Sequence, residues 1–310
     1  MRTSVRCAGV GLVALAACAA DEGTLVLAGP AADDALATCP ILPADDPWNQ
    51  DVSGAPVHPR SAAIVANIQA HGDPTLKADF GASAAWGIPF VVVQASQPAV
   101  PVRFDLYPDQ SDPGPYPVPA NAAVEAGHDH HVLVVQQGAC RLFEMYRASR
   151  EGAGWRAGAG AVFDLRRGTT RPAGWTSADQ AGLPIFPGLV RWDEVSRGAI
   201  RHALRVTFAH TRAAWVAPAT HPGGDDDDDA PAMGQRLRLR SDYDVSAMRG
   251  AARVIAVALQ RYGMLVADTG ANWYVSGATD PRWNDADLAQ LRAIPGTAFE
   301  VLDTGPVTTP

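Results

Sequence analysis

Lysine is almost absent from this chain of 310 residues: of its 25 basic residues, Lys77 is the only lysine and the rest are arginines. Acidic residues number 33, which gives a formal net charge of −8 at pH 7. Proteins that bind nucleic acids generally present a basic surface to the phosphate backbone. The charge balance therefore argues against a nucleic-acid partner.

Beyond its N-terminal segment, the sequence has no apolar run of the roughly 18 residues that a membrane-spanning helix needs. Of its four cysteines, two lie in the first 18 residues, and the remaining two, Cys39 and Cys140, lack the second pair that a cysteine-type zinc site requires. Nucleotide-binding glycine loops, the GxSxG elbow and the HExxH motif are missing. We expect no cofactor. Apolar residues still make up 47% of the chain, which is enough for a sizeable core.

The N-terminal segment has the form of an export signal. A stretch with two arginines precedes an apolar run over residues 7–17, which is too short to cross a bilayer. The sequence before Cys18 resembles the bacterial lipobox, in which the cysteine is freed and acylated. We expect residues 1–17 to be a signal peptide and Cys18 to carry the lipid of an outer-membrane lipoprotein. The alternative is an ordinary cleaved signal and a secreted protein.

The remaining chain divides by composition. Residues 18–46 are rich in Ala, Asp, Gly and Pro, which is typical of a flexible tether, and residues 47–305 are expected to form a single β-rich domain. Export places Cys39 and Cys140 in an oxidising space, which favours a disulfide over two free thiols. The five adjacent carboxylates of Asp225–Asp229 repel one another, so 223–231 is expected to be a solvated acidic surface loop rather than a calcium loop.

Short segments rich in β-branched and aromatic residues dominate the domain. They predict strands at 90–94, 102–107, 131–136, 141–148, 161–165, 202–208, 214–218, 236–240, 264–268, 273–277 and 299–303. Tight hairpin turns are expected at 136–139 and 269–272, and helices at 62–70, 247–262 and 285–293. The expected fold is mainly β, a β-sandwich or its jelly-roll form, with about three packed helices.

Strand alternation suggests one polar face. Along their strands, Glu144 and Tyr146 point to one side, and Arg205 and Thr207 also share one side. Asp164 points to the side opposite its apolar neighbours. If these strands are neighbours, Glu144 and Asp164 form an acid/base pair suited to glycoside hydrolysis, with Tyr146 and Arg205 contacting the substrate. A lyase would need a base and a cation near the substrate carboxylate. The alternative is a solvated face, where Glu144 and Arg205 pair with little energetic effect.

Two further groups of residues are candidates for the site. Trp175 and Trp192 fall near loops, where an indole can stack on a sugar ring, although most tryptophans are buried. His128 and His130 would share one side of a strand that begins near residue 130, opposite His131. Such a pair can supply two imidazoles to a metal, but no second motif fixes a third ligand.

The segments RPAGWTSADQAGLPIFPGLVRWDEV (171–195), HALRVTF (202–208) and ALQRYGMLVADTGANWYVSG (258–277) resemble a group of exported bacterial and fungal proteins of unassigned function. The resemblance extends over most of the chain from residue 46 onward. It implies an extracellular protein, and some members resemble parts of glycan-degrading systems. The resemblance supplies no set of catalytic residues.

These observations predict an exported cell-surface protein that acts on a polysaccharide, by glycoside hydrolysis. It would reach the membrane through its lipid anchor alone. One alternative is a non-catalytic surface lipoprotein that binds a glycan or a protein partner. A second is a histidine-based metalloprotein.

Overall fold

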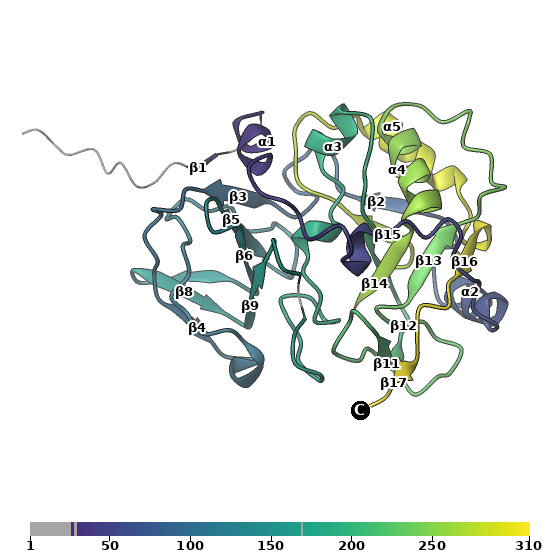
Figure 1. The fold of residues 1–310 in the computed structure, drawn as a ribbon, viewed down its shortest axis with the longest axis horizontal. Helices are drawn as coiled ribbons and strands as arrows, with labels where there is room; N and C mark the ends of the chain where they lie inside the picture. Colours follow the sequence, from purple (N-terminus) through teal and green to yellow (C-terminus); the bar gives the residue numbers. More distant parts are fainter. Residues whose placement is uncertain (1–25, 28–29, 169) are drawn as a thin grey trace, which may run out of the picture.

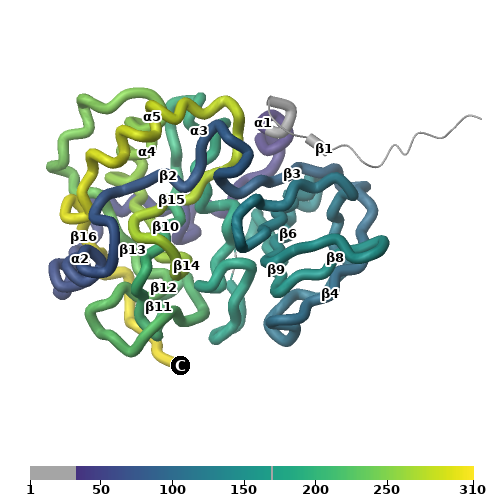
Figure 2. Tube along the Cα trace, turned by 180° about the vertical axis from the view of Figure 1, so that it is seen from behind, coloured from purple at the N-terminus to yellow at the C-terminus, as the bar shows by residue number. Residues whose placement is uncertain are grey.

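The computed structural model describes residues 26–27, 30–168 and 170–310. They form two lobes that lie side by side (Figure 1). The small lobe, in blue and teal, holds strands from residues 26–164 except β2, and the large lobe, mostly in green and yellow, holds the later strands together with residues 61–79. Figure 2 shows the same two lobes from behind. The predicted signal peptide 1–17 and the lipid site Cys18 lie outside the described residues.

The small lobe contains two sheets, a five-stranded one of order β1-β3-β5-β6-β9 and a three-stranded one of order β4-β8-β7. Their strands are β1 Val26–Leu27, β3 Phe90–Val93, β4 Val102–Phe104, β5 Val132–Gln136, β6 Arg141–Tyr146, β7 Ser149–Glu151, β8 Gly154–Ala157 and β9 Ala159–Asp164. The hairpin turn predicted at 136–139 is confirmed, because β5 and β6 pair antiparallel on either side of it.

Both faces of the five-stranded sheet are buried, and each faces a different core. Leu133 and Leu142 belong to a core shared with the large lobe, whereas Val134 and Phe143 pack in a second core against the three-stranded sheet. Because side chains alternate along a strand, residues adjacent in sequence enter opposite cores. A strand buried on both faces has little place for polar residues, which explains the continuous apolar runs in β3 and β5.

The large lobe is built on a mixed six-stranded sheet of order β16-β13-β14-β10-β15-β2, beside a small sheet of order β12-β11-β17. Their strands are β2 Lys77–Asp79, β10 Leu204–Phe208, β11 Arg212–Val216, β12 Ala232–Met233, β13 Arg236–Leu239, β14 Met264–Thr269, β15 Tyr274–Ser276, β16 Phe299–Val301 and β17 Val307–Thr308. The hairpin predicted at 269–272 is wrong. β10 lies between β14 and β15, parallel to the first and antiparallel to the second.

The three predicted helices are present as α2 Ser61–Ala70, α4 Gly250–Arg261 and α5 Asp285–Ala289, the last followed by a 3-10 turn at Gln290–Ala293. Two short helices, α1 Pro30–Leu36 and α3 Trp192–Ser196, were not predicted, and further 3-10 turns lie at Pro47–Asn49, Pro108–Gln110, Phe186–Gly188 and Gly296–Ala298. The mainly β class is confirmed, and the sandwich arrangement stays a prediction. None of the helices in the described ranges has the length and apolar character that crossing a membrane requires.

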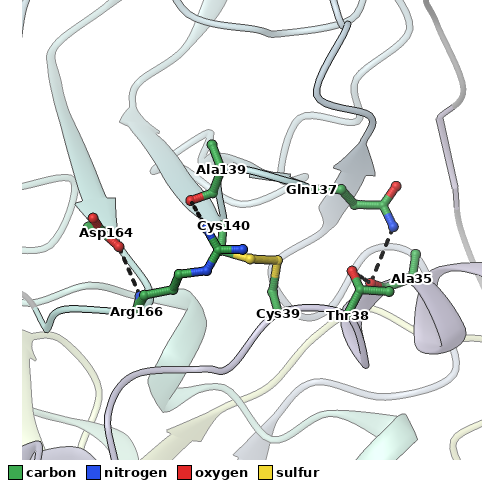
Figure 3. Close-up of a disulfide and its surroundings, with 8 residues drawn as sticks. All are labelled: Ala35, Thr38, Cys39, Gln137, Ala139, Cys140, Asp164 and Arg166. Carbon is green, nitrogen blue, oxygen red and sulfur yellow. Dashed lines mark hydrogen bonds between the residues drawn. A yellow bond between two sulfur atoms is a disulfide. The ribbon is translucent and has the colours of Figure 1, made fainter.

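The N-terminal arm, residues 30–46, is the longer described part of the segment 18–46 that was predicted to be a flexible tether, and it carries the short helix α1. Leu36, the last residue of α1, and Leu42 are buried in the shared core. The predicted disulfide Cys39–Cys140 is confirmed and ties the arm to the start of β6, as Figure 3 shows. Asp33 adds an ion pair with Arg282 at 2.7 Å. The disulfide holds the arm where its few apolar side chains reach the core.

Candidate functional site

A polar cleft of about 220 Å³ opens where the two lobes meet. The small lobe contributes Tyr107, Asp129 and Tyr146, and the large lobe contributes Asp268 near the end of β14. Residues 176–180, in the segment that connects the lobes, also line the cleft, together with His221 and Thr269. Ligand sites are often found at such junctions, where two rigid units bring their side chains together.

A β-bulge aims Asp268 at this cleft. The parallel register of β10 and β14 shifts after Val266, so that Thr207 lies beside Asp268 and Ala267 is the extra residue. Without the insertion, Asp268 would point to the same side as Val266, which is part of the apolar core. The bulge turns it to the side of Arg205 and Thr207 instead. Bulges redirect side chains in this way beside many active sites.

Arg205 lies buried beneath the cleft, with its side chain 5% exposed. Its Nε and Nη2 donate to the two carboxylate oxygens of Asp179 at 2.8 and 2.9 Å, and its Nη1 donates to Ser276 Oγ at 2.7 Å. Nη2 also contacts Asp268 Oδ2 at 3.2 Å. Bidentate arginine–carboxylate pairs are strong and directional. This pair therefore holds the segment 176–180 against the six-stranded sheet.

Asp268 differs from an ordinary aspartate in its proton affinity. Burial raises the pKa of Asp268, the negative charge of Asp179 acts in the same direction, and the guanidinium of Arg205 opposes the rise. The charge of Asp129, from the other lobe, adds to it. The side chain is still 23% exposed. A partly accessible carboxyl group that keeps its proton to higher pH is suited to donate that proton to a ligand.

His131 lies buried behind the cleft, with both ring nitrogens within hydrogen-bond distance of oxygen atoms. Its Nδ1 lies 2.7 Å from Glu125 Oε2, and its Nε2 lies 3.1 Å from the carbonyl oxygen of Ala178. Both partners offer oxygen atoms that can accept a hydrogen bond, an arrangement that favours a proton on each ring nitrogen. Burial opposes this charge, but the hydrogen bond and the charge of Glu125 raise the pKa of His131. The ring thus fixes the Ala178 carbonyl in the lining segment.

Glu144, predicted as a catalytic group, has no exposed surface and does not line the cleft. Its Oε1 accepts the N–H groups of Ile185 and Phe186 at 3.0 and 2.8 Å, and its Oε2 accepts that of Ile185 at 2.9 Å. Burial raises the pKa of Glu144 to about 7, although these backbone donors act against the rise. Its observed role is to fix the chain that leads from the cleft into the large lobe.

Asp164, the predicted partner of Glu144, lies on the opposite face of the five-stranded sheet. Glu144 is opposite Ala161 in the β6–β9 pair, whereas Asp164 is opposite Arg141. Positions 141 and 144 differ by an odd number, so their side chains leave opposite faces. Asp164 accepts the N–H of Arg166 at 3.0 Å near the disulfide (Figure 3). The predicted convergence of the two carboxylates is therefore wrong.

The predicted substrate contacts have different surroundings. Tyr146 lines the cleft, and Arg205 supports it from below. Trp175 is half-buried, with the guanidinium of Arg171 5.6 Å from its ring centroid. Trp192 packs edge-on against Trp283 with ring centroids 5.1 Å apart. Neither tryptophan lines the cleft.

The histidine cluster is not brought together with a third ligand. His128 and His130 are exposed, while His131 points to Glu125. Within the ranges that the structure describes, no three His, Cys, Asp or Glu side chains are grouped as a metal site would require. The residues present thus give no support to the metalloprotein alternative.

The acidic loop 223–231 lies at the surface, and four of its five carboxylates, those of Asp225, Asp227, Asp228 and Asp229, have ion-pair partners. Asp229 is 2.6 Å from Arg60, and His210 lies 3.0 Å from Asp227 and 3.3 Å from Asp225. These contacts anchor the loop beside the start of α2 and the end of β10. Exposed pairs of this kind contribute little to stability, so the loop remains peripheral.

Sequence reasoning missed the three aspartates of the cleft. Asp268 ends an apparently regular strand, and only the bulge turns it outward. Asp179 lies in a segment without periodicity, and Asp129 was considered only as part of the histidine cluster. No protein-family model, curated protein or solved structure matches this chain. The chemistry therefore has to be inferred from the cleft itself.

Proposed function

We propose that the protein hydrolyses glycosidic bonds of a polysaccharide in the cleft between its lobes. The observation that supports this is Asp268, an aspartic acid with a raised pKa, in a polar cleft to which the other lobe contributes a second carboxylate, Asp129. Inverting and retaining glycosidases both work with two such carboxyl groups. The rings of Tyr107 and Tyr146 offer walls against which a sugar can pack.

In this scheme Asp268 donates its proton to the glycosidic oxygen, and the bond from that oxygen to the anomeric carbon breaks. Asp129 takes a proton from the attacking water in an inverting reaction, or bonds to the anomeric carbon in a retaining one. Arg205 and Asp179 do not contact the sugar. They position Asp268 and the lining segment, and the charge of Asp179 helps to keep the acid protonated.

The charges of the cleft favour hydrolysis over elimination. Among the described residues that line it, the charged ones are aspartates, and burial lowers the pKa of the one lining histidine, His221. The donors of Arg205 are already used by Asp179, Ser276 and Asp268. Elimination from a uronate needs a cation beside the substrate carboxylate. We therefore propose a substrate without carboxylates at the cleaved linkage.

The proposed substrate lies outside the cytoplasm. The disulfide Cys39–Cys140 supports this location, because such bonds persist mainly in oxidising compartments. The signal pattern of residues 1–17 supports it as well. We propose a lipoprotein anchored through Cys18, with a secreted form as the alternative.

The test is a panel of plant, fungal and bacterial polysaccharides, assayed for new reducing ends and for the ultraviolet absorbance of unsaturated uronates. We expect the first signal without the second. Asp268→Asn should lower kcat/KM by roughly 100-fold to 10,000-fold, the usual contribution of a positioned general acid, and Asp129→Asn should be similarly impaired. Asp164→Asn, on the other face of the sheet, is the matched control and should keep wild-type activity.

Wild-type rates in both cleft variants would remove the assignment of the chemistry to this cleft. A loss confined to Asp164→Asn, with an unchanged melting temperature, would restore the role that the sequence predicted for Asp164. Binding of a glycan by the wild type without turnover would support the non-catalytic alternative.

A further inference from the structure

A second groove, of about 300 Å³, lies at the edge of the six-stranded sheet. Its lining comes from the edge strand β2, from the loop that follows it, from β15, from α5 and from the 3-10 turn after α5, and includes Asp79, Trp86, Tyr274 and Arg292. None of its lining residues belongs to the cleft.

Trp86 is unusual among the eight tryptophans of the chain. Its side chain is 59% exposed, whereas the other seven are buried or half-buried. An indole normally buries most of its large apolar surface. A ligand bound in the groove would cover this exposed apolar surface.

The exposed ring sits on a fixed backbone. The N–H of Trp86 donates to the carbonyl oxygen of Ser83 at 3.0 Å, and its own carbonyl accepts from Thr279 Oγ1 at 3.0 Å. The same loop is tied to α5, because Asp285 Oδ1 accepts the N–H of Ala82 at 2.9 Å. The backbone that carries the indole is thus fixed before binding, which lowers the entropy cost of binding.

The polar groups of the groove have unused bonding capacity. Asp79 is half-buried and Arg292 is exposed, and neither makes a side-chain hydrogen bond or an ion pair with another described residue. Burial raises the pKa of Asp79. The groove therefore combines a flat apolar ring with one free acceptor and one free set of donors.

We propose that this groove binds a sugar residue of a polysaccharide, as a binding site separate from the cleft. The indole of Trp86 would stack on the apolar face of the sugar ring, while Asp79 and Arg292 bond to its hydroxyl groups. A protein partner would need a much larger contact, since stable interfaces bury more than roughly 1,000 Å². The site would add a second contact to the same chain and does not depend on hydrolysis.

The experiment measures binding rather than turnover. Asp268→Asn, which the proposed function renders inactive, is mixed with each insoluble polysaccharide of the panel and sedimented, and soluble oligosaccharides are titrated against tryptophan fluorescence. We expect binding of at least one glycan with a change in fluorescence. Adding Trp86→Ala should weaken that binding about tenfold or more, as expected for a loss of 1.4 kcal/mol, and Trp86→Phe should restore part of it.

Two further measurements separate this inference from the proposed function. Trp86→Ala alone should keep the wild-type melting temperature and the wild-type rate on a short soluble substrate, and Arg292→Ala should weaken polymer binding severalfold. Glycan binding that depends on Trp86 in a protein without hydrolase activity would leave the inference standing and end the proposed function. Binding that is unchanged by Trp86→Ala, or no binding of any glycan, would overturn the inference.

Discussion

Glu144 is a carboxyl group without any exposed surface, bound only by backbone N–H groups of Ile185 and Phe186. Burial raises its pKa from 4.5 to about 7. The folded protein therefore holds this proton more tightly than the unfolded chain does. Its contribution to stability is greatest below pH 4.5, falls as pH rises towards 7, and is constant above that.

We expect Glu144→Gln to remove this pH dependence. At 1.36 kcal/mol per pKa unit, the wild type should lose roughly 3 kcal/mol of unfolding free energy from this group as pH rises from 4.5 to about 7. Urea unfolding of both proteins at several pH values measures the effect. The stability advantage of the wild type over the variant should shrink with rising pH. An advantage that is the same at every pH would contradict the expectation.

At the scale of single residues, the sequence could predict to which face of its strand a side chain points, but not which residues of other strands lie beside it. Strand alternation correctly placed Glu144 and Phe143 on opposite faces of their strand, and likewise Arg205 and Leu204. Tyr146, as predicted from its face, lines the cleft. It could not show how β6 and β9 are registered, which places Asp164 on the far face. It also could not show the extra residue Ala267, because a bulge depends on the partner strand.

At the scale of elements, the local pattern of apolar residues predicted several strands and helices correctly. The apolar runs of β5 and β14 and the periodicity of α4 were enough to predict those segments, and Gly263, with a φ of 67°, lies just beyond the end of α4. The short helices α1 and α3 gave no periodic signal. The hairpin predicted at 269–272 failed because its turn residues show only that the chain reverses. They carry no information about β10, which comes from a distant part of the chain.

The arm that carries α1 depends on one covalent link. Cys39 and Cys140 are separated by 101 positions, and closing a loop of this length restricts the unfolded chain considerably. Replacing both residues, as Cys39→Ala with Cys140→Ala, should lower the free energy of unfolding by roughly 4 kcal/mol. Denaturant unfolding measures this, with the reduced wild type as the matched control. A variant as stable as the oxidised wild type would show that the noncovalent contacts of the arm suffice.

At the scale of the whole molecule, the two lobes share one apolar core. Leu142 of the small lobe and Leu204 of the large lobe belong to the same buried cluster. The bonds from Glu144 to Ile185 and from Asp179 to Arg205 cross the same junction. The two lobes are thus distinct in the ribbon of Figure 1, but the apolar core beneath them is continuous.

We therefore expect one cooperative unfolding transition. Far-ultraviolet circular dichroism and tryptophan fluorescence should give the same midpoint. Leu142→Ala in the small lobe and Leu237→Ala in the large lobe should each lower stability by about 2–5 kcal/mol and shift both signals together. Two separate midpoints, or a shift of one signal alone, would show that the lobes unfold independently.

The continuous core also determines how a ligand can enter the cleft. In enzymes whose halves meet only at a wet surface, a hinge can swing the halves apart to admit a chain. Here such a swing would expose packed leucines to water, at about 2.5 kcal/mol for every 100 Å² uncovered. We therefore expect the mouth of the cleft to keep its width, so that a ligand enters and leaves by diffusion rather than by opening of the lobes.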